Sequence, residues 1–242
     1  MRVLGPTLLV VVRHAESIRN QIKKDTVYFA DDAARRVVRG TPDHQIALTP
    51  AGHEQARQTG RAIRERFGLF DYVYTSGYTR TEQTAQGLLE AYTDEERARI
   101  RVERNFYLRE RDPGYTYDMT EAEAKAAFPW LEEYWQTFGH FFSRPPGGES
   151  LADVAARVDT FLSMLARDHD GQRVLLVVHG GTIRCLRFLL ERWPYEKVSE
   201  LLVEDPPKNC GVTTYERSAT GALQLVEYNR VYWTVGSAED GR

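Results

Sequence analysis

The chain has 242 residues, of which 42% are hydrophobic and 28% charged, a composition typical of a folded protein rather than a disordered one. Its 32 basic and 35 acidic residues give a net charge of −3, so there is no overall attraction to nucleic acid or to an anionic membrane. The longest apolar runs are far shorter than the about 20 residues that span a bilayer, and two cysteines make no disulfide framework, so we expect a cytoplasmic protein.

Five segments have the pattern of β-strands. The runs 8–12 and 174–178 are continuous and rich in valine and leucine, as in central strands that are buried on both faces. The segment 72–75 is a shorter candidate. The segments 212–216 and 223–228 are expected to be later strands that meet at a turn.

Helices are expected between these strands. Thr49 is a favourable N-cap and is followed by a first-turn proline, which predicts a helix over 50–67. Ser150 with Asp153 resembles a capping box at the start of another helix with one apolar face. Two further helices are predicted over 79–92 and 182–191. This alternation predicts an α/β fold, a three-layer α/β/α sandwich with a mostly parallel central sheet.

The segment 104–147 differs from the rest because it holds eleven aromatic residues. Two interpretations are open: a small helical subdomain with its own core, or a lid whose aromatic faces meet a substrate. We expect one domain over 1–242, with 104–147 as a lid insertion and 236–242 as a flexible tail.

Charged residues and histidines follow three of the predicted strands directly. The first buried strand leads into Arg13 and His14, and the second into His179 and Gly180, which opens a helix. Arg80 begins the helix after the strand 72–75. Because ligands bind beyond the carboxyl ends of strands in such sheets, these cations are expected to converge on an anion, for which phosphate is the natural candidate.

In their order along the chain, these motifs resemble those of the histidine phosphatase superfamily, also called phosphoglycerate mutase-like. Arg13-His14-Ala15-Glu16-Ser17 is similar to the family's Arg-His-Gly-Glu signature, with alanine in place of glycine. The segment 75–85 is similar to the family's second arginine motif. The segment 108–111 is similar to its acid-bearing segment, and 178–181 is similar to its second histidine motif. The stretch 138–150, which ends in Gly-Gly-Glu-Ser, is similar to a branch of broad-specificity phosphatases.

The resemblance implies a phosphatase that needs no metal or cofactor and acts on a small-molecule phosphomonoester through a phosphohistidine on His14. Arg13, Arg80 and a protonated His179 would hold the phosphate oxygens and lower the pKa of His14, so that its ring stays neutral. Glu110 would protonate the leaving oxygen and then activate water. The alternative for Glu110 is a surface carboxylate paired with a neighbouring arginine.

Further residues near these motifs are candidates for substrate binding. Four of them are expected to contact substrate or support the loop after His14: Asn20, Gly180, Ser17 and Glu16. A basic cluster is either a rim that attracts anionic substrates or a solvated loop: Arg19, Lys23, Lys24, Arg35, Arg36 and Arg39.

Two other functions stay open beside the phosphatase. A phosphoglycerate mutase uses the same phosphohistidine, although Ala15, the segment 75–85 and the residues after Glu110 depart from mutase patterns. A non-catalytic phosphate-binding module of the same fold is the other alternative. The sequence does not predict the physiological substrate or the oligomeric state.

Overall fold

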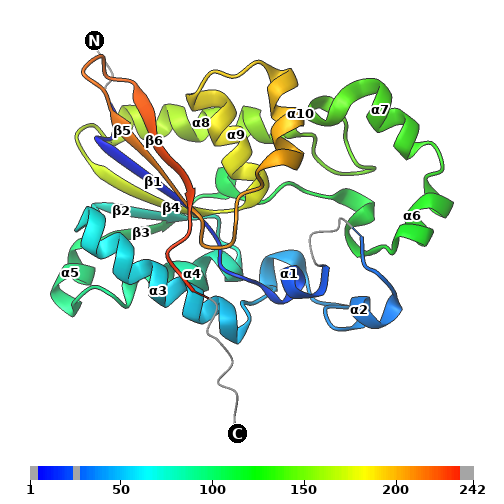
Figure 1. Ribbon diagram of the computed structural model, residues 1–242, viewed down its shortest axis with the longest axis horizontal. Helices are drawn as coiled ribbons and strands as arrows, with labels where there is room; N and C mark the ends of the chain where they lie inside the picture. Colours follow the sequence, from blue (N-terminus) through cyan, green and yellow to red (C-terminus); the bar gives the residue numbers. More distant parts are fainter. Residues whose placement is uncertain (1–4, 24–27, 235–242) are drawn as a thin grey trace, which may run out of the picture.

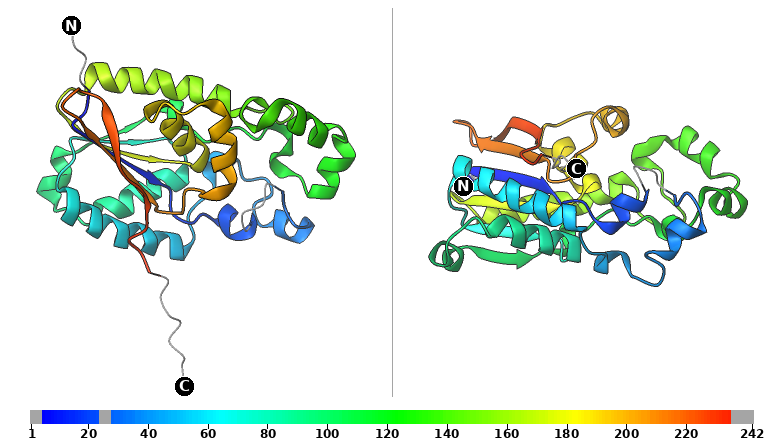
Figure 2. Two further views of the ribbon diagram at one scale, coloured as in Figure 1. Left: turned by 45° about the horizontal axis from the view of Figure 1, so that its top comes forward. Right: turned by 60° about the horizontal axis from the view of Figure 1, so that its bottom comes forward.

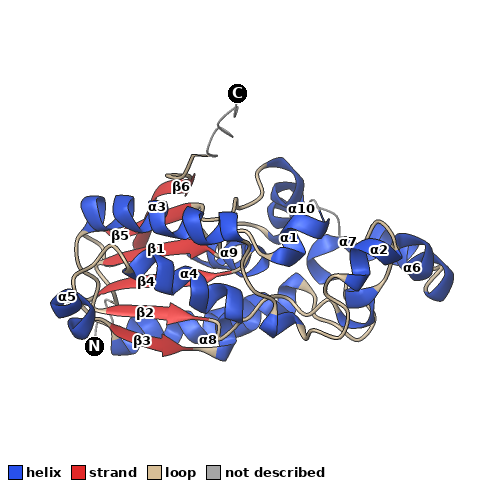
Figure 3. Ribbon diagram, turned by 90° about the horizontal axis from the view of Figure 1, so that it is seen from below, coloured by secondary structure: helices blue, strands red, loops and turns tan. Residues whose placement is uncertain are grey.

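The computed structural model describes residues 5–23 and 28–234, and at its centre lies a six-stranded sheet. The strands are β1 (Leu8–Arg13), β2 (Tyr72–Thr75), β3 (Arg101–Arg104), β4 (Arg173–Val178), β5 (Val212–Arg217) and β6 (Leu223–Arg230). Figure 3 shows their order across the sheet, β3-β2-β4-β1-β5-β6. The first four strands in this order are parallel, and β5 and β6 are antiparallel to their neighbours.

Helices cover both faces of this sheet. The helices of the described residues are α1 (Ile18–Lys23), α2 (Asp32–Arg36), α3 (Pro50–Phe67), α4 (Thr79–Leu89), α5 (Asp94–Arg99), α6 (Glu121–Ala127), α7 (Leu131–Phe142), α8 (Leu151–Asp168), α9 (Gly180–Leu190) and α10 (Tyr195–Glu204). Figures 1 and 3 show α3 and α4 on one face and α8 and α9 on the other. The expected three-layer α/β/α sandwich is therefore confirmed.

The alternation of side chains along the central strands divides the core between the two faces. On β1, Leu9 and Val11 pack in the cluster that includes α8 and α9, whereas Val10 and Val12 pack in the cluster that includes α3 and α4. All four are essentially inaccessible to solvent. Burial on both faces explains why this strand is a continuous apolar run rather than an alternating one.

Two of the predicted helix starts, at Thr49 and Ser150, are confirmed in detail. The Thr49 hydroxyl accepts a hydrogen bond from the Gly52 amide at 2.9 Å, and α3 ends at Phe67 as expected. Ser150 and Asp153 form the reciprocal hydrogen bonds of a capping box at the start of α8. Local side-chain caps satisfy amides that the helix itself leaves without acceptors, which is why these signals are readable in the sequence.

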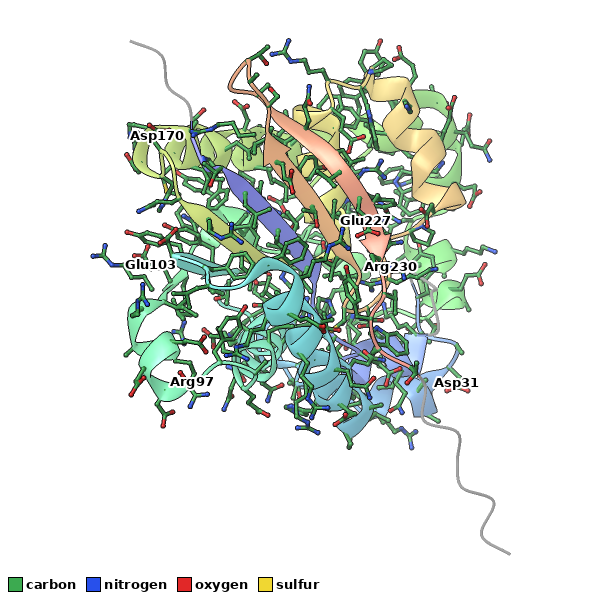
Figure 4. The ribbon with its side chains drawn as sticks, turned by 60° about the vertical axis from the view of Figure 1, so that its left-hand side comes forward. Asp31, Arg97, Glu103, Asp170, Glu227 and Arg230 are labelled. Atoms are coloured by element: carbon green, nitrogen blue, oxygen red, sulfur yellow. The ribbon has the colours of Figure 1, made fainter. Side chains whose placement is uncertain are left out.

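Strand β3 is an element that the sequence pattern did not reveal. Each of its four residues is exposed, and three of them are charged. Figure 4 shows Glu103 of this strand at the margin of the molecule. A polar edge strand has no apolar alternation, and its charges discourage pairing with a second sheet.

The segment 104–147 forms an arm that projects beyond the carboxyl ends of the parallel strands and ends in α6 and α7 (Figures 1 and 2). All eleven of its aromatic residues are described, and Phe141 alone is buried. Ring pairs such as Trp130 with Tyr134 contact one another, but most of these aromatic residues stay partly exposed, and buried Phe141 packs in the main core. The described part of the arm therefore shows aromatic contacts without a buried aromatic core of its own. The tail expected over 236–242 lies outside the described residues.

Among the described parts of the chain, no helix is both long and apolar enough to cross a membrane.

Candidate active site

The strand register brings the two histidines together. Arg13 at the end of β1 lies opposite Val178 at the end of β4, so His14 and His179 follow at neighbouring strand ends. The His14 amide donates to the Val178 carbonyl at 2.8 Å, and the two imidazole centroids are 5.2 Å apart. Parallel pairing thus places residues that are far apart in sequence at one edge of the sheet.

A cavity of about 580 Å³ opens at this edge. Its lining includes seven of the predicted catalytic and substrate-binding residues: Arg13, His14, Ser17, Asn20, Arg80, Glu110 and Gly180. His179 is fully buried beside His14, and Glu16 points elsewhere. Arg13 and Arg80 therefore converge with His14 on one cavity.

The ring of His14 is held in one tautomer. Its Nδ1 lies 2.8 Å from the carbonyl oxygen of Ala15, and because a carbonyl only accepts, Nδ1 carries the proton. The lone pair then resides on Nε2. Burial, reinforced by the Arg80 and Arg13 cations, holds the pKa of His14 well below its ordinary value of 6.5. His14 is therefore a neutral imidazole with an unprotonated Nε2, as a nucleophile requires.

The surroundings of the His179 ring disfavour its protonated form. Burial is the main cause that holds the pKa of His179 well below 6.5, and repulsion from the Arg80 cation is the next. Its Nε2 lies 2.8 Å from the Ser76 hydroxyl, and its Nδ1 lies 3.9 Å from a Glu110 carboxylate oxygen. A fully buried ring surrounded by guanidinium groups binds a proton poorly unless a negative charge enters beside it.

Both arginines of the site are held by acceptors of the protein. Arg13 donates to the Pro207 carbonyl at 2.6 Å. Arg80 donates to the Asp43 carbonyl at 2.7 Å and to its carboxylate at 3.0 Å, and its guanidinium carbon lies 4.7 Å from the centre of the Tyr78 ring. These contacts fix the directions in which the guanidinium groups present their remaining N–H donors.

Glu110 is held both through its backbone, by an ionic network, and through its side chain, which accepts a hydrogen bond from the Arg111 amide at 2.8 Å. Arg157 of α8 donates to the Glu110 carbonyl at 3.1 Å, and also to Glu149, which takes a 2.5 Å ion pair from Arg109. Arg109 is thereby turned toward Glu149, while Glu110 lines the cavity. A Cβ at Gly181 would lie 2.7 Å from the Glu110 carboxylate, so this glycine permits the close approach.

The loop after His14 is organised by polar side chains. The Asn20 Oδ1 accepts from the Ser17 hydroxyl at 2.9 Å and from Asn209, which also donates to the His14 carbonyl. Glu16 accepts from the Thr49 hydroxyl at 2.7 Å and so ties the loop to the start of α3. Of the two roles expected for Glu16, the structure places it in loop support.

The basic cluster after His14 separates into two groups. Arg19 and Lys23 line the cavity. Arg35 pairs with Glu123 at 2.8 Å, away from it. Arg36 and Arg39 are exposed, and Lys24 lies outside the described residues.

Several residues of the site were not singled out from the sequence. Ser76 and Thr81 lie within the motif that carries Arg80, but only the fold brings the Ser76 hydroxyl to His179, with the Thr81 hydroxyl behind it against Ser76. Asp43 gave no signal, since an aspartate after Thr-Pro is typical of a turn. Arg184 enters the cavity from α9, one turn after Gly180.

Two histidines and two arginines thus meet at the carboxyl edge of a central α/β sheet, an arrangement whose charges suit an oxyanion. The profile of the histidine phosphatase superfamily (branch 1) matches residues 9–230. The chain belongs to the histidine phosphatase superfamily.

The proteins that this chain resembles in sequence or in fold are named for more than one reaction. A 2,3-bisphosphoglycerate-dependent phosphoglycerate mutase of Parvibaculum lavamentivorans is 32% identical over 199 residues, which are 81% of this chain and 85% of the mutase. The α-ribazole phosphatase of Shigella flexneri has the same fold, with a TM-score of 0.71 at 20% identity over 95% of this chain and all of the phosphatase. A mycobacterial glucosyl-3-phosphoglycerate phosphatase, solved with VO3, gives a TM-score of 0.67 at 24% identity, over 92% of this chain and 99% of that one.

Proposed function

We propose that this chain is a metal-independent phosphatase that hydrolyses phosphomonoesters through a phosphohistidine on His14. The observation that carries the proposal is the Nδ1 hydrogen bond to the Ala15 carbonyl, which leaves Nε2 as the nucleophilic nitrogen in a cavity that Arg13 and Arg80 also line. We place the activity in the cytoplasm, since Cys185 and Cys210 are both buried free thiols rather than disulfide partners.

In the first half-reaction, Nε2 of His14 attacks phosphorus in line, and the bond between phosphorus and the ester oxygen breaks. Glu110 gives its proton to the departing oxygen, so the product leaves as a neutral alcohol. Arg13 and Arg80 stabilise the charge on the phosphoryl oxygens. The incoming dianion favours protonation of His179, whose Nδ1–H then becomes a further donor.

In the second half-reaction, water attacks the phosphorus of the phosphohistidine and gives its proton to Glu110. The bond between phosphorus and nitrogen breaks, inorganic phosphate forms, and His14 is neutral again. The Glu110 side chain keeps 26% of its surface exposed, so water can reach the carboxylate that acts as the base.

A phosphoglycerate mutase is the second candidate, supported by the 32% identity to the mutase of Parvibaculum lavamentivorans. A mutase must shield its phosphohistidine from water while the substrate reorients. The solvent access of Glu110 and the departures of Ala15 and the segment 75–85 from mutase patterns favour hydrolysis.

The test compares two reactions of the purified protein. We expect hydrolysis of p-nitrophenyl phosphate to exceed isomerisation of 3-phosphoglycerate, and a quenched reaction with a radiolabelled ester to yield an acid-labile, base-stable phosphoenzyme. His14→Ala should lower turnover by about 10³-fold or more and abolish the label. His53→Ala, on α3 outside the cavity lining, is the matched control.

Faster isomerisation than hydrolysis would make the chain a mutase. Binding of inorganic phosphate without any phosphoenzyme would make it a non-catalytic module.

A further inference from the structure

An ion pair lies behind the loop that carries Glu110. Arg157 of α8 keeps only 8% of its side chain exposed, and Glu149, two residues before α8, keeps 15%. The Arg157 Nε donates to one Glu149 carboxylate oxygen at 3.0 Å, and the Arg157 Nη2 donates to the other at 3.1 Å. Both residues are outside the described lining of the cavity, so we expect that they do not touch the substrate.

Stability by itself is a weak explanation for this pair. Removing two charges from water costs free energy, and well-packed apolar side chains of similar volume often give a fold equal or greater stability. An apolar pair, however, cannot hold backbone carbonyl and amide groups. The polar groups that Arg157 and Glu149 bind are therefore the better explanation for the two charges.

Arg157 holds the carbonyl side of the loop. Its Nη1 donates to the Tyr107 carbonyl at 2.5 Å, and its Nη2 donates to the Glu110 carbonyl at 3.1 Å. The planar guanidinium presents these donors in a fixed geometry, so the distance between the two carbonyls is set by one rigid group.

Glu149 holds the loop on the other side of Glu110. Its carboxylate accepts from the Asp112 amide at 3.0 Å and from Arg109 at 2.5 Å. Although burial acts to raise the pKa of Glu149, hydrogen bonds from Arg157 and from the Asp112 amide hold that pKa below its ordinary value. The carboxylate is therefore charged at neutral pH.

The loop needs these contacts because regular structure does not hold it. Residues 109–113, all of them described, form neither helix nor strand. The Glu110 carboxylate must nevertheless stay in a narrow space, 3.9 Å from Nδ1 of His179 and against Gly181. A general acid works only within hydrogen-bond reach of the leaving oxygen, and a displacement of about 1 Å can cost about a hundredfold in rate.

We propose that Arg157 and Glu149 are positioning residues for the general acid: their ion pair holds the backbone on both sides of Glu110, so that its carboxylate reaches the leaving oxygen. This inference rests on the proposed phosphatase function. It adds two residues that act on the reaction through Glu110, from outside the cavity.

The test uses two esters that differ in their need for a proton, p-nitrophenyl phosphate and n-propyl phosphate. Nitrophenolate leaves without a proton, whereas propoxide needs one. The quantity compared is the ratio of kcat/KM for the propyl ester to kcat/KM for the nitrophenyl ester. A general loss of folded or active protein lowers both constants equally and cancels in this ratio.

Arg157→Lys keeps the positive charge, but an ammonium group cannot reproduce the fixed contacts of the guanidinium. We expect this variant to lower the ratio about tenfold, because a displaced Glu110 protonates the leaving oxygen poorly. Glu149→Gln removes the other charge and should lower the ratio in the same direction. Arg167→Lys, the same substitution at an exposed position of α8, is the control and should keep the ratio of the unaltered protein.

A double-mutant cycle tests whether the effect passes through Glu110. Adding Arg157→Lys to Glu110→Gln should change the ratio less than about twofold, because the acid that the substitution displaces is already absent. Should Arg157→Lys fail to fold, Glu149→Gln takes its place in both comparisons.

The outcomes separate this inference from the function on which it rests. A ratio that stays unchanged in the variants of the ion pair, or that falls just as far when Glu110→Gln is present, would overturn the positioning role and leave the phosphatase intact. An unaltered protein that hydrolyses neither ester would instead refute the proposed function. An unchanged ratio in Glu110→Gln alone would remove Glu110 as the acid, and the positioning role with it.

Discussion

His179 and Ser76 are joined by a 2.8 Å contact between the ring Nε2 and the hydroxyl oxygen. Ser76 in turn lies 3.0 Å from the Thr81 hydroxyl, which donates to the Tyr78 carbonyl at 2.8 Å. Because Thr81 uses its proton on a carbonyl, Ser76 donates to Thr81 and accepts from Nε2–H of His179. This chain of hydroxyls fixes the tautomer of His179 and turns its Nδ1 toward Glu110.

The first prediction concerns this positioning chain. Ser76→Ala should lower kcat by about tenfold with a smaller change in KM, because the ring of His179 loses the acceptor that orients it. The ¹⁵N chemical shifts of the His179 ring should show a mixture of tautomers in this variant. Thr81→Ser retains a hydroxyl and should keep both kcat and the shifts, and unchanged shifts in Ser76→Ala would show that Ser76 has no orienting role.

The second prediction concerns proton transfer by Glu110. Glu110→Gln should reduce hydrolysis of an alkyl phosphate at least about tenfold more than hydrolysis of p-nitrophenyl phosphate, because nitrophenolate leaves without a proton. A series of esters with graded leaving-group pKa values measures this. An equal loss across the series would remove Glu110 as the acid.

The third prediction concerns Asp43, whose carboxylate occupies two N–H groups of Arg80. Asp43→Asn should tighten binding of inorganic phosphate by about fivefold, because Arg80 is released from a competing anion. Titration calorimetry gives the dissociation constant. Asp159→Asn, the same charge change at an exposed position of α8, is the control, and weaker phosphate binding in Asp43→Asn would mean that Asp43 orients Arg80 instead.

The fourth prediction concerns stability. The folded-state pKa values of His14 and His179 lie well below 6.5, so between that value and the folded pKa the unfolded chain binds protons that the folded chain does not. The free energy of unfolding should therefore fall as pH drops below 6.5, by about 1.4 kcal/mol per pH unit for each histidine. Urea denaturation between pH 7.5 and about 5.5 measures the slope.

His14→Gln should remove roughly half of that slope, since one of the two buried histidines is gone. A free energy of unfolding that stays constant over this range would contradict neutral burial of the pair.

The fifth prediction concerns metal ions. EDTA should leave hydrolysis of p-nitrophenyl phosphate unchanged, because Arg13 and Arg80 supply the positive charge that a divalent ion supplies elsewhere. A loss of activity that added Mg²⁺ or Zn²⁺ restores would refute this mechanism.

The sequence by itself determined many of the strands and helices that make up the fold. The run Leu8–Val12, the Thr49 cap and the Ser150 capping box are local signals, and each specifies its element through neighbouring residues. The same local order placed His14 and His179 at strand ends. Convergence of the two histidines then followed from parallel pairing, whose rules do not depend on the particular side chains.

Only the tertiary structure determines which charged groups of the site pair with one another and which face the cavity. Nothing near Asp43 indicates that it holds Arg80, which lies 37 residues away, or that Arg19 and Lys23 face the cavity while Arg36 faces solvent. The neutral state of His179 likewise depends on burial and on guanidinium groups from other strand ends. Electrostatic energies depend on distance and on hydration, and both are set by packing between segments that the sequence separates.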